Sequence, residues 1–201
     1  MDFGAANHGA ATTNVGGTST HDLVAEQARE VVAVDIVPFY SDPHPKCRYV
    51  VANLLNGDSW QNSNIQLVDL MFAGHVIEHL DCPGDVFELA NSAIERDGRL
   101  LIVTPNPLWF VGVWARSTYQ NASVNVDHVA LFGAGELAEL AERHGFQLVE
   151  WRYAGRGDMV RSFRVYAGLK GRVIDAAYRF ARARNLAFAH NHLVALFARQ
   201  P

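Results

Sequence analysis

The chain has 201 residues, of which 49% are hydrophobic and 19% are charged, and its formal net charge is −4. This composition excludes an intrinsically disordered chain, and the length is enough to bury one substantial core. The longest apolar stretch is far shorter than the roughly 20 residues of a membrane span, and no signal-like leader follows Met1. We therefore expect one cytoplasmic domain over residues 1–201 without a transmembrane segment.

Charge is distributed unevenly along the chain. Residues 1–151 hold 7 Lys and Arg against 19 Asp and Glu, whereas residues 152–201 hold 10 against 2. A basic tail binds nucleic acid or an anionic membrane in some proteins, and in others it solvates a helix that packs on an acidic body. The aromatic residues of this tail do not form a base-stacking pattern, so we do not expect nucleic acid as a partner. The two cysteines, Cys47 and Cys82, lie outside any CxxC motif and predict neither a disulfide framework nor a metal site.

Short β-branched runs alternate with helical stretches along the chain. Strands are predicted at residues 30–36, 48–53, 68–73, 99–104, 146–153 and 193–197. Helices are predicted at 21–28, 83–95, 134–144 and about 169–184, and Gly98 and Gly145 lie just beyond the ends of the second and third helices. This alternation is typical of a doubly wound α/β fold, with a mostly parallel sheet and helices on both faces.

Ligands of such sheets bind at the carboxyl ends of the strands, where this chain has two informative segments. The first is the loop from Asp2 to Gly9, whose small residues allow the backbone to approach a ligand closely. The second is Asp35, which ends an apolar run and offers a carboxylate to both hydroxyls of a ribose. Together they predict a nucleoside site, and a nicotinamide dinucleotide satisfies that pattern as well as other nucleosides do.

A more specific pattern begins at residues 68–80, which end in Glu78-His79-Leu80, and continues through residues 98–107, His128, Phe132 and Gly145-Phe146. These segments resemble the class I S-adenosylmethionine-dependent methyltransferases, in particular the subgroup with Glu-His-Leu after the fourth strand. The resemblance covers about residues 1–153 and implies a Rossmann-like methyltransferase sheet. It also implies transfer of a methyl group from S-adenosylmethionine to an oxygen or nitrogen of a small-molecule acceptor.

The resemblance assigns cofactor-binding positions in the loops after four strands. They are Asp2, Gly4, Ala5 and Ala6 around the methionine portion, Asp35, Ile36, Asn53 and Leu54 at the ribose and adenine, and Gly74, His75 and Val76 near the sulfonium. If the acceptor is a hydroxyl, an imidazole can remove its proton, and His128 and then His75 are the candidate catalytic bases. His79 is more simply explained as fixing the loop by hydrogen bonding.

The acceptor side is expected to follow the fifth strand, with Trp109, Trp114 and Tyr119 as apolar walls. These side chains predict an apolar or ring-bearing acceptor. In the basic tail, Arg172, Arg179 and Arg182 alternate with apolar residues in an amphipathic pattern, so a lipid-linked acceptor at a membrane surface is a second candidate.

Two features depart from the family pattern. Ala6 replaces a glycine of the family's loop, and the strand that normally precedes Asp2 is missing, so we expect a sheet without its first strand. That loss would leave backbone groups of the neighbouring strands unpaired, at a cost on the order of 1–3 kcal/mol for each buried group. A truncated reading, a strand from another segment or subunit, and a non-catalytic methyltransferase-like binding module are the three explanations. A nicotinamide-dinucleotide-dependent oxidoreductase is a further alternative.

Overall fold

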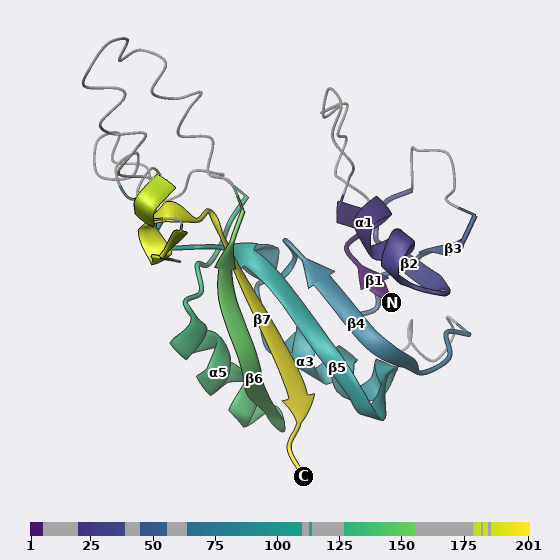
Figure 1. The fold of residues 1–201 in the computed structure, drawn as a ribbon. Coiled ribbons are helices and arrows are strands. Elements are labelled where there is room, and N and C mark those ends of the chain that lie inside the picture. Colours follow the sequence, from purple (N-terminus) through teal and green to yellow (C-terminus); the bar gives the residue numbers. More distant parts are fainter. Residues whose placement is uncertain are drawn as a thin grey trace.

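The computed structural model describes residues 1–5, 20–38, 45–55, 64–109, 113, 127–155, 179–181, 183–184 and 186–201. Their strands form one seven-stranded sheet (Figure 1). From one edge to the other, the order is β3 (Cys47–Val51), β2 (Val31–Asp35), β1 (Asp2–Phe3), β4 (Val68–Gly74), β5 (Ile94–Pro105), β7 (His192–Arg199) and β6 (Phe146–Ala154). The first five are parallel to one another, and β7 runs antiparallel to both β5 and β6. The predicted α/β class with a mostly parallel sheet is confirmed.

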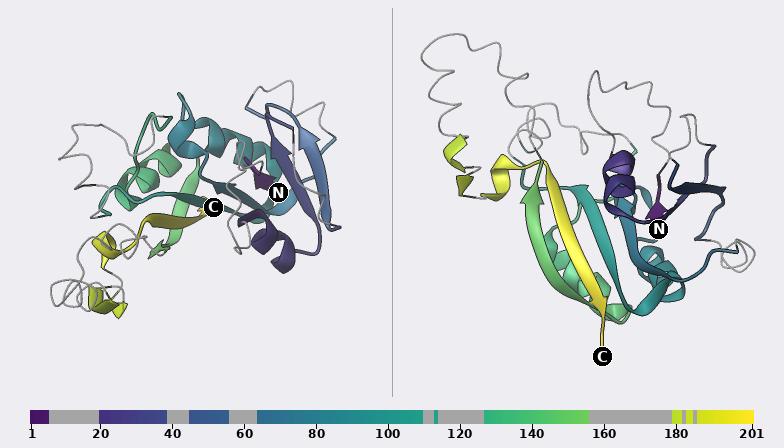
Figure 2. Two further views of the ribbon diagram at one scale, coloured as in Figure 1. Left: turned by 90° about the horizontal axis from the view of Figure 1, so that it is seen from above. Right: turned by 45° about the vertical axis from the view of Figure 1, so that its right-hand side comes forward.

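Helices pack on both faces of this sheet (Figure 2). α1 (Thr20–Gln27) packs through Ala25 on Val31 and Ala33 of β2. Because side chains alternate between the two faces of a strand, Val34 points to the opposite face, where it joins the main core. There α3 (Asp85–Ala93) and α5 (Ala134–Arg143) cover β4, β5, β6 and β7. The two faces therefore have separate cores, and the larger one supports the β4–β5 part of the sheet.

The strand β5 begins five residues earlier than the sequence predicts. The helix α3 ends at Ala93, and Ile94 already pairs with Val68 of β4. Ile94 is buried in the main core, which outweighs the helical pattern that had extended the helix to residue 95. Gly98, which was interpreted as a helix end, instead lies at an irregularity in the pairing, where a side chain would lie 2.2 Å from Cγ2 of Ile94.

The first strand is present, which corrects the expectation that the sheet lacks it. The strand β1 has two residues, and Asp2 and Phe3 pair with Ala33 and Val34 on one side and with Phe72 and Ala73 on the other. Both side chains of β1 are buried. Main-chain bonds extend the pairing by one residue, because the amide of Phe72 donates to the carbonyl of Met1 at 2.8 Å. Two paired residues are enough to hold β2 and β4 on either side of β1.

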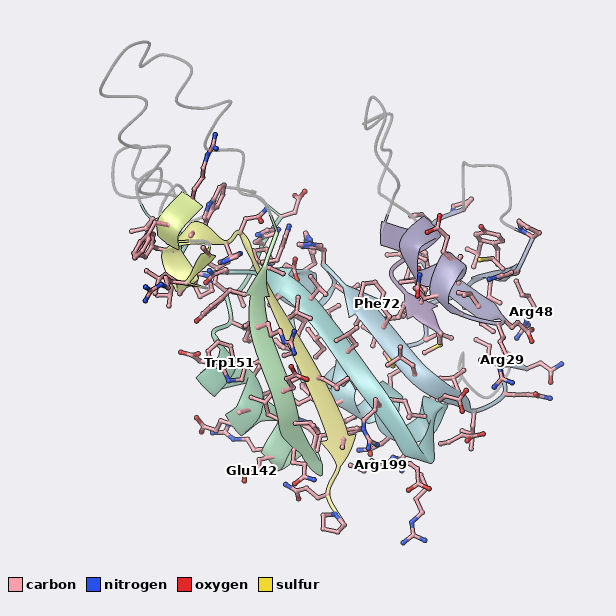
Figure 3. All side chains as sticks on the ribbon, viewed as in Figure 1. Arg29, Arg48, Phe72, Glu142, Trp151 and Arg199 are labelled. Carbon is pink, nitrogen blue, oxygen red and sulfur yellow. The ribbon has the colours of Figure 1, made fainter. Side chains whose placement is uncertain are left out.

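Below β1, a groove of about 1120 Å³ opens between the amino-terminal halves of β2 and β4. Val32, Leu70 and Leu101 are among its lining side chains, and Arg29 and Arg48 contribute to its polar part (Figure 3). The α-ammonium of Met1 lies at the upper end of the groove and donates to the carbonyl of Leu70 at 2.6 Å. Burial lowers the pKa of this ammonium below its ordinary value. The short β1 thus pairs the upper halves of its neighbours and leaves their lower halves apart.

Much of the basic tail lies outside the described residues, including Arg172 and Arg182. Of the helix predicted at 169–184, residues 179–181 and 183 are helical, and a short 3-10 helix η2 (Ala187–Ala189) leads into β7. Within the described ranges, no helix is long and apolar enough to cross a membrane.

Candidate functional site

The carboxyl ends of β1 and β4 meet at Gly4 and Val76. Gly4 has a φ of +76°, a conformation that glycine adopts without strain, and a Cβ at this position would lie 2.2 Å from Cγ2 of Val76. Its amide donates to the carbonyl of Val34 at 2.9 Å, which fixes the loop against β2 as well. The predicted neighbours Gly4 and Val76 are therefore in contact, and a small residue is required at position 4. Ala5 also bonds to Val34, and Ala6 lies outside the described residues.

Asp35 ends β2 at the same edge of the sheet. Its side chain is buried, and its Oδ1 accepts the amide of Val37 at 3.1 Å, the local bond by which Asp orients a turn. The next residue, Ile36, is 60% exposed despite its large apolar side chain. A held carboxylate beside an exposed apolar surface suits a ribose hydroxyl pair next to the face of a base.

After β3, the two predicted adenine contacts differ in environment. Asn53 is exposed, and its Oδ1 accepts the amide of Leu55 at 3.2 Å. An amide oxygen has a second lone pair, so this bond leaves room for another donor. Leu54 is buried and belongs to the main core instead of lying at the surface. Of this pair, Asn53 is the one whose side chain lies at the surface.

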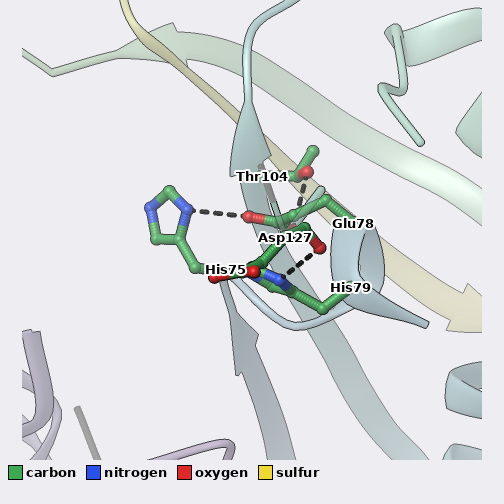
Figure 4. Close-up of polar contacts among 5 residues, drawn as sticks. All are labelled: His75, Glu78, His79, Thr104 and Asp127. Carbon is green, nitrogen blue, oxygen red and sulfur yellow. Dashed lines mark hydrogen bonds and ion pairs between the residues drawn. The ribbon is translucent and has the colours of Figure 1, made fainter. Parts of the chain in front are cut away.

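The chain turns sharply at the end of β4. His75 has a φ of +57°, which is uncommon for a residue with a side chain, and its amide donates to the carbonyl of Val103 at 2.7 Å. At Gly74, a Cβ would lie 2.6 Å from the ring of Phe72. This turn directs the His75 side chain toward the short 3-10 helix η1 (Ile77–His79) (Figure 4).

Glu78 is a completely buried carboxylate at the centre of the site. Its Oε1 accepts Nδ1–H of His75 at 3.0 Å, and its Oε2 accepts the hydroxyl of Thr104 from β5 at 3.0 Å (Figure 4). Burial by itself would raise the pKa of this carboxyl, but the hydrogen bond and charge of His75, a backbone amide and Thr104 together lower it. Glu78 is therefore an anion, and it orients His75 with Nε2 directed away from the bond.

Two further imidazoles lie next to Glu78. The rings of His79 and His128 meet edge to face with centroids 4.8 Å apart, and Nδ1–H of His79 donates to the carbonyl of Asp127 at 3.0 Å. The amide of Val129 donates to the carbonyl of Glu78 at 2.9 Å, so residues 127–130 are held against η1. Burial is the largest of the effects that lower the pKa of His128, followed by those of neighbouring charges. The donor atoms of Glu78, His79 and His128 lie within 4.8 Å of one another, close enough to share a metal ion after small rotations.

His192 is a member of this group that the sequence analysis missed. Its ring meets that of His75 edge to face at 4.8 Å, although the two residues are 117 positions apart. Burial, with a further contribution from His75, lowers the pKa of His192 to about 4. Its buried Nδ1 has no hydrogen-bond partner among the described residues. The only signal in the sequence is its position at the start of the last predicted strand.

The predicted acceptor walls are described only in part. Trp109 is in the described range and its Nε1 is buried without a partner there, whereas Trp114 and Tyr119 lie outside it. Before it, Asn106 fixes the end of β5 by donating to the carbonyls of Ala187 and His190 at 2.7 and 2.8 Å. The loop after β5 therefore starts from a rigid position beside Thr104.

The predicted site residues thus gather at one edge of the sheet, while the groove lies at the opposite ends of the same strands. A Rossmann-like nucleoside-binding protein has a mostly parallel sheet, a glycine in the turn after the first strand and a carboxylate at the end of the second. This chain has all three, with Gly4 after β1 and Asp35 at the end of β2.

The family follows from sequence comparison, because a methyltransferase-domain family model matches residues 2–151. The chain belongs to this family and is an S-adenosylmethionine-dependent methyltransferase domain. This assignment decides against a nicotinamide-dependent oxidoreductase. The chain has no significant match among curated proteins.

Solved structures share the fold at low sequence identity. A SAM-dependent methyltransferase from Archaeoglobus fulgidus has a TM-score of 0.60 at 17% identity, covering 99% of this chain and 84% of that one. The Burkholderia thailandensis 1,6-didemethyltoxoflavin-N1-methyltransferase, with its heterocycle and S-adenosylhomocysteine bound, has 0.55 at 17%, covering 99% and 69%. LepI in complex with SAM has a TM-score of 0.59 at 11% identity. The match covers 99% of this chain but only 42% of LepI.

Proposed function

We propose that this protein transfers the methyl group of S-adenosylmethionine to an oxygen or nitrogen of a small-molecule acceptor. The observation that carries the proposal is the buried Glu78 carboxylate, which holds His75 at the carboxyl edge of β4, beside the Gly4–Val76 contact. The similarity to a toxoflavin-type N-methyltransferase supports a small acceptor. We also infer that the chain is one domain, because the seven strands of its described residues belong to one sheet. The Glu78-His79-Leu80 segment after β4 supports the Glu-His-Leu subgroup.

The residues at the carboxyl edge fit this cofactor. Gly4 lets the loop after β1 pack directly against Val76, because a Cβ at this position would lie 2.2 Å from Cγ2 of Val76, and this contact holds the proposed cofactor loops together. Asp35 would hold the ribose, and Ile36 and Asn53 would lie against the adenine. Asp2, Ala5, Ala6, Leu54, Gly74 and Val76 complete the proposed binding set, with Leu54 supporting it from the core.

When bound, S-adenosylmethionine supplies a methyl group that is already activated for displacement by a nucleophile. The chain then has two tasks, which are to orient the acceptor heteroatom and to take its proton. Orientation alone is worth about 7–11 kcal/mol in well-aligned reactions. The acceptor would lie against the imidazoles of the site and the start of the loop after β5, where Trp109 offers an apolar wall.

His75 and His128 are the two candidate bases. The geometry favours His75, because Glu78 fixes its tautomer with Nδ1–H bonded and leaves Nε2 to accept a proton. This is the same logic by which a carboxylate orients the histidine of a catalytic triad. His128 is held as a neutral imidazole by its lowered pKa, so it too is in the form that accepts a proton at pH 7. A His75→Gln and a His128→Gln variant, compared for turnover at equal cofactor binding, would rank the two.

Calorimetric titration with S-adenosylmethionine and with a nicotinamide dinucleotide tests the cofactor. We expect one site for the first and none for the second. Incubation with radiolabelled methyl donor and a metabolite extract then tests transfer and identifies the acceptor. A protein that binds the donor but labels nothing over a broad set of extracts would support the non-catalytic alternative, and one that does not bind it would contradict the proposal.

A further inference from the structure

Three metal-binding side chains of different origin converge at the top of β4. Glu78 and His79 come from η1, and His128 comes from the segment that follows β5 about fifty residues later. Their donor atoms all lie within 4.8 Å of one another, and Glu78 is completely buried. Methyl transfer as described above needs at most one imidazole and one carboxylate, so it assigns no role to one further histidine or to the second ring nitrogen of His79, whose first nitrogen bonds to Asp127.

Hydrogen bonds from neighbouring groups fix the orientation of His79 and Glu78, as such bonds do for the ligands of metal ions. His79 donates Nδ1–H to the carbonyl of Asp127, so its Nε2 carries a lone pair directed away from that bond. Metal-ligating histidines are oriented in this way by a backbone carbonyl or a carboxylate. Glu78 is positioned in turn by Thr104 and His75, and a carboxylate has about four lone-pair sites, so these two bonds leave others for an ion.

We propose that Glu78, His79 and His128 bind one divalent transition-metal ion. The role of the ion rests on the proposed function: it would hold the acceptor's oxygen or nitrogen beside His75. Three protein ligands leave an open coordination position, which is the arrangement of metal sites that bind a substrate or water instead of serving structure alone.

The ligand types predict which ions bind. Two imidazoles and one carboxylate suit zinc, cobalt, nickel or iron, whereas magnesium and calcium prefer oxygen ligands. On a four-coordinate ion with bonds of about 2.1 Å, the donors are about 3.4 Å apart. The present arrangement would therefore contract mainly by rotation of the half-buried His128 side chain toward Glu78 and His79, which their hydrogen bonds hold in place. The cluster also contacts the candidate base directly, because Glu78 accepts Nδ1–H of His75 at 3.0 Å.

The experiment uses Co²⁺ as the probe, because its visible absorption reports on coordination by nitrogen and oxygen. The full chain is titrated with Co²⁺, with Mg²⁺ as the comparison ion, and no methyl donor is added. We expect one site, a visible band and at least tenfold weaker binding of Mg²⁺. His128→Ala and His79→Ala should each weaken Co²⁺ binding at least tenfold. His144→Ala is the matched control, because His144 is a half-buried histidine that stacks on Phe87 away from the cluster, and it should bind Co²⁺ like the unmodified protein.

Circular dichroism of each variant shows whether it is folded, and two ligand variants are used so that the failure of one to fold does not remove the test. The proposal would be overturned if the His128→Ala variant bound Co²⁺ as tightly as the unmodified protein. It would also be overturned if only the His144→Ala variant lost affinity. Titration of the same samples with S-adenosylmethionine separates this proposal from the proposed function. A protein that binds the methyl donor but no Co²⁺ overturns only the metal site. One that binds Co²⁺ but no methyl donor overturns the proposed function, and with it the role of the ion, and leaves the metal site supported.

Discussion

The two ends of β2, β1 and β4 differ in how completely they are built. At the carboxyl ends, each loop is fixed by specific bonds: Gly4 to Val34, Asp35 to Val37, and His75 to both Val103 and Glu78. At the amino ends, β2 and β4 separate around a groove of about 1120 Å³, because β1 pairs with only two residues of each. On the β1 side, the bonds that fix the carboxyl edge therefore involve only Asp2, Phe3 and the loop after them, whereas β1 does not join the amino-terminal halves of β2 and β4.

The largest expected effect is a loss of S-adenosylmethionine affinity when Gly4 is replaced. Gly4→Val forces a branched side chain into a positive-φ position and into contact with Val76, which should weaken S-adenosylmethionine binding by roughly 2–3 kcal/mol, or about a hundredfold. Calorimetry of the folded variant measures it. Gly135→Ala in α5, where a methyl group meets nothing within 4 Å, is the control and should leave binding unchanged. Near-normal binding by Gly4→Val would mean that the donor does not approach this loop.

The second effect concerns the stability of the carboxyl edge at low pH. The pKa of His192 is about 4 in the folded protein and about 6.5 in the unfolded chain, so the unfolded state takes up more protons between these values. The stabilising contribution is complete above pH 6.5 and is lost as the pH falls toward 4, which should lower the unfolding free energy by about 2 kcal/mol for a half-buried ring.

Urea denaturation at pH 7 and pH 5 compares the unmodified protein with His192→Gln. The variant should lose less stability between the two pH values, because it removes the group that must be protonated in the unfolded state. An equal loss in both proteins would assign the pH dependence to other groups.

The third effect is a smaller loss of S-adenosylmethionine affinity, expected when Asp35 is replaced. Asp35→Ala removes a carboxylate that Val37 holds in place, and we expect S-adenosylmethionine to bind at least tenfold more weakly, or about 1.4 kcal/mol. Asp35→Asn keeps the bond to Val37 and loses the charge, so its affinity should lie between the two. If Asp35→Ala binds the donor normally, the ribose contact has been assigned to the wrong residue.

The smallest effect is expected at the groove. Leu67 lines it and is 55% exposed, so Leu67→Ala should change the unfolding free energy by less than about 0.5 kcal/mol and leave S-adenosylmethionine affinity unchanged. Thermal unfolding and calorimetry measure the two quantities. A clear loss of donor binding by Leu67→Ala would show that the groove at the amino ends of the strands affects the site at their carboxyl ends.

The strands of the sheet were largely predictable from sequence, because each is an apolar run between polar loops. The strand β1 was not, since two residues cannot show a pattern, and its existence depends on pairing with β2 and β4. The start of β5 at Ile94 was missed because local helix propensity extended α3, whereas burial against Val68 decides the conformation.

The candidate site was predictable where it follows strand ends, and less so where it depends on distant contacts. Asp35, Gly4 and Val76 lie at one edge because parallel strands all end there. The role of Glu78 as the centre of a histidine cluster was not visible, because His128 and His192 reach it from segments 50 and 114 residues later. Only the return of β7 beside β5 brings His192 to His75.

The Met1 nitrogen and Pro201 lie in very different surroundings. The Met1 nitrogen lies inside the sheet and donates to the carbonyl of Leu70, at the upper end of the groove between β2 and β4. Pro201, by contrast, is exposed beyond the end of β7 and lies at the outer end of the sheet (Figure 1). Residues joined ahead of Met1 would therefore lie between two central strands, whereas residues joined after Pro201 would leave the sheet at its outer end.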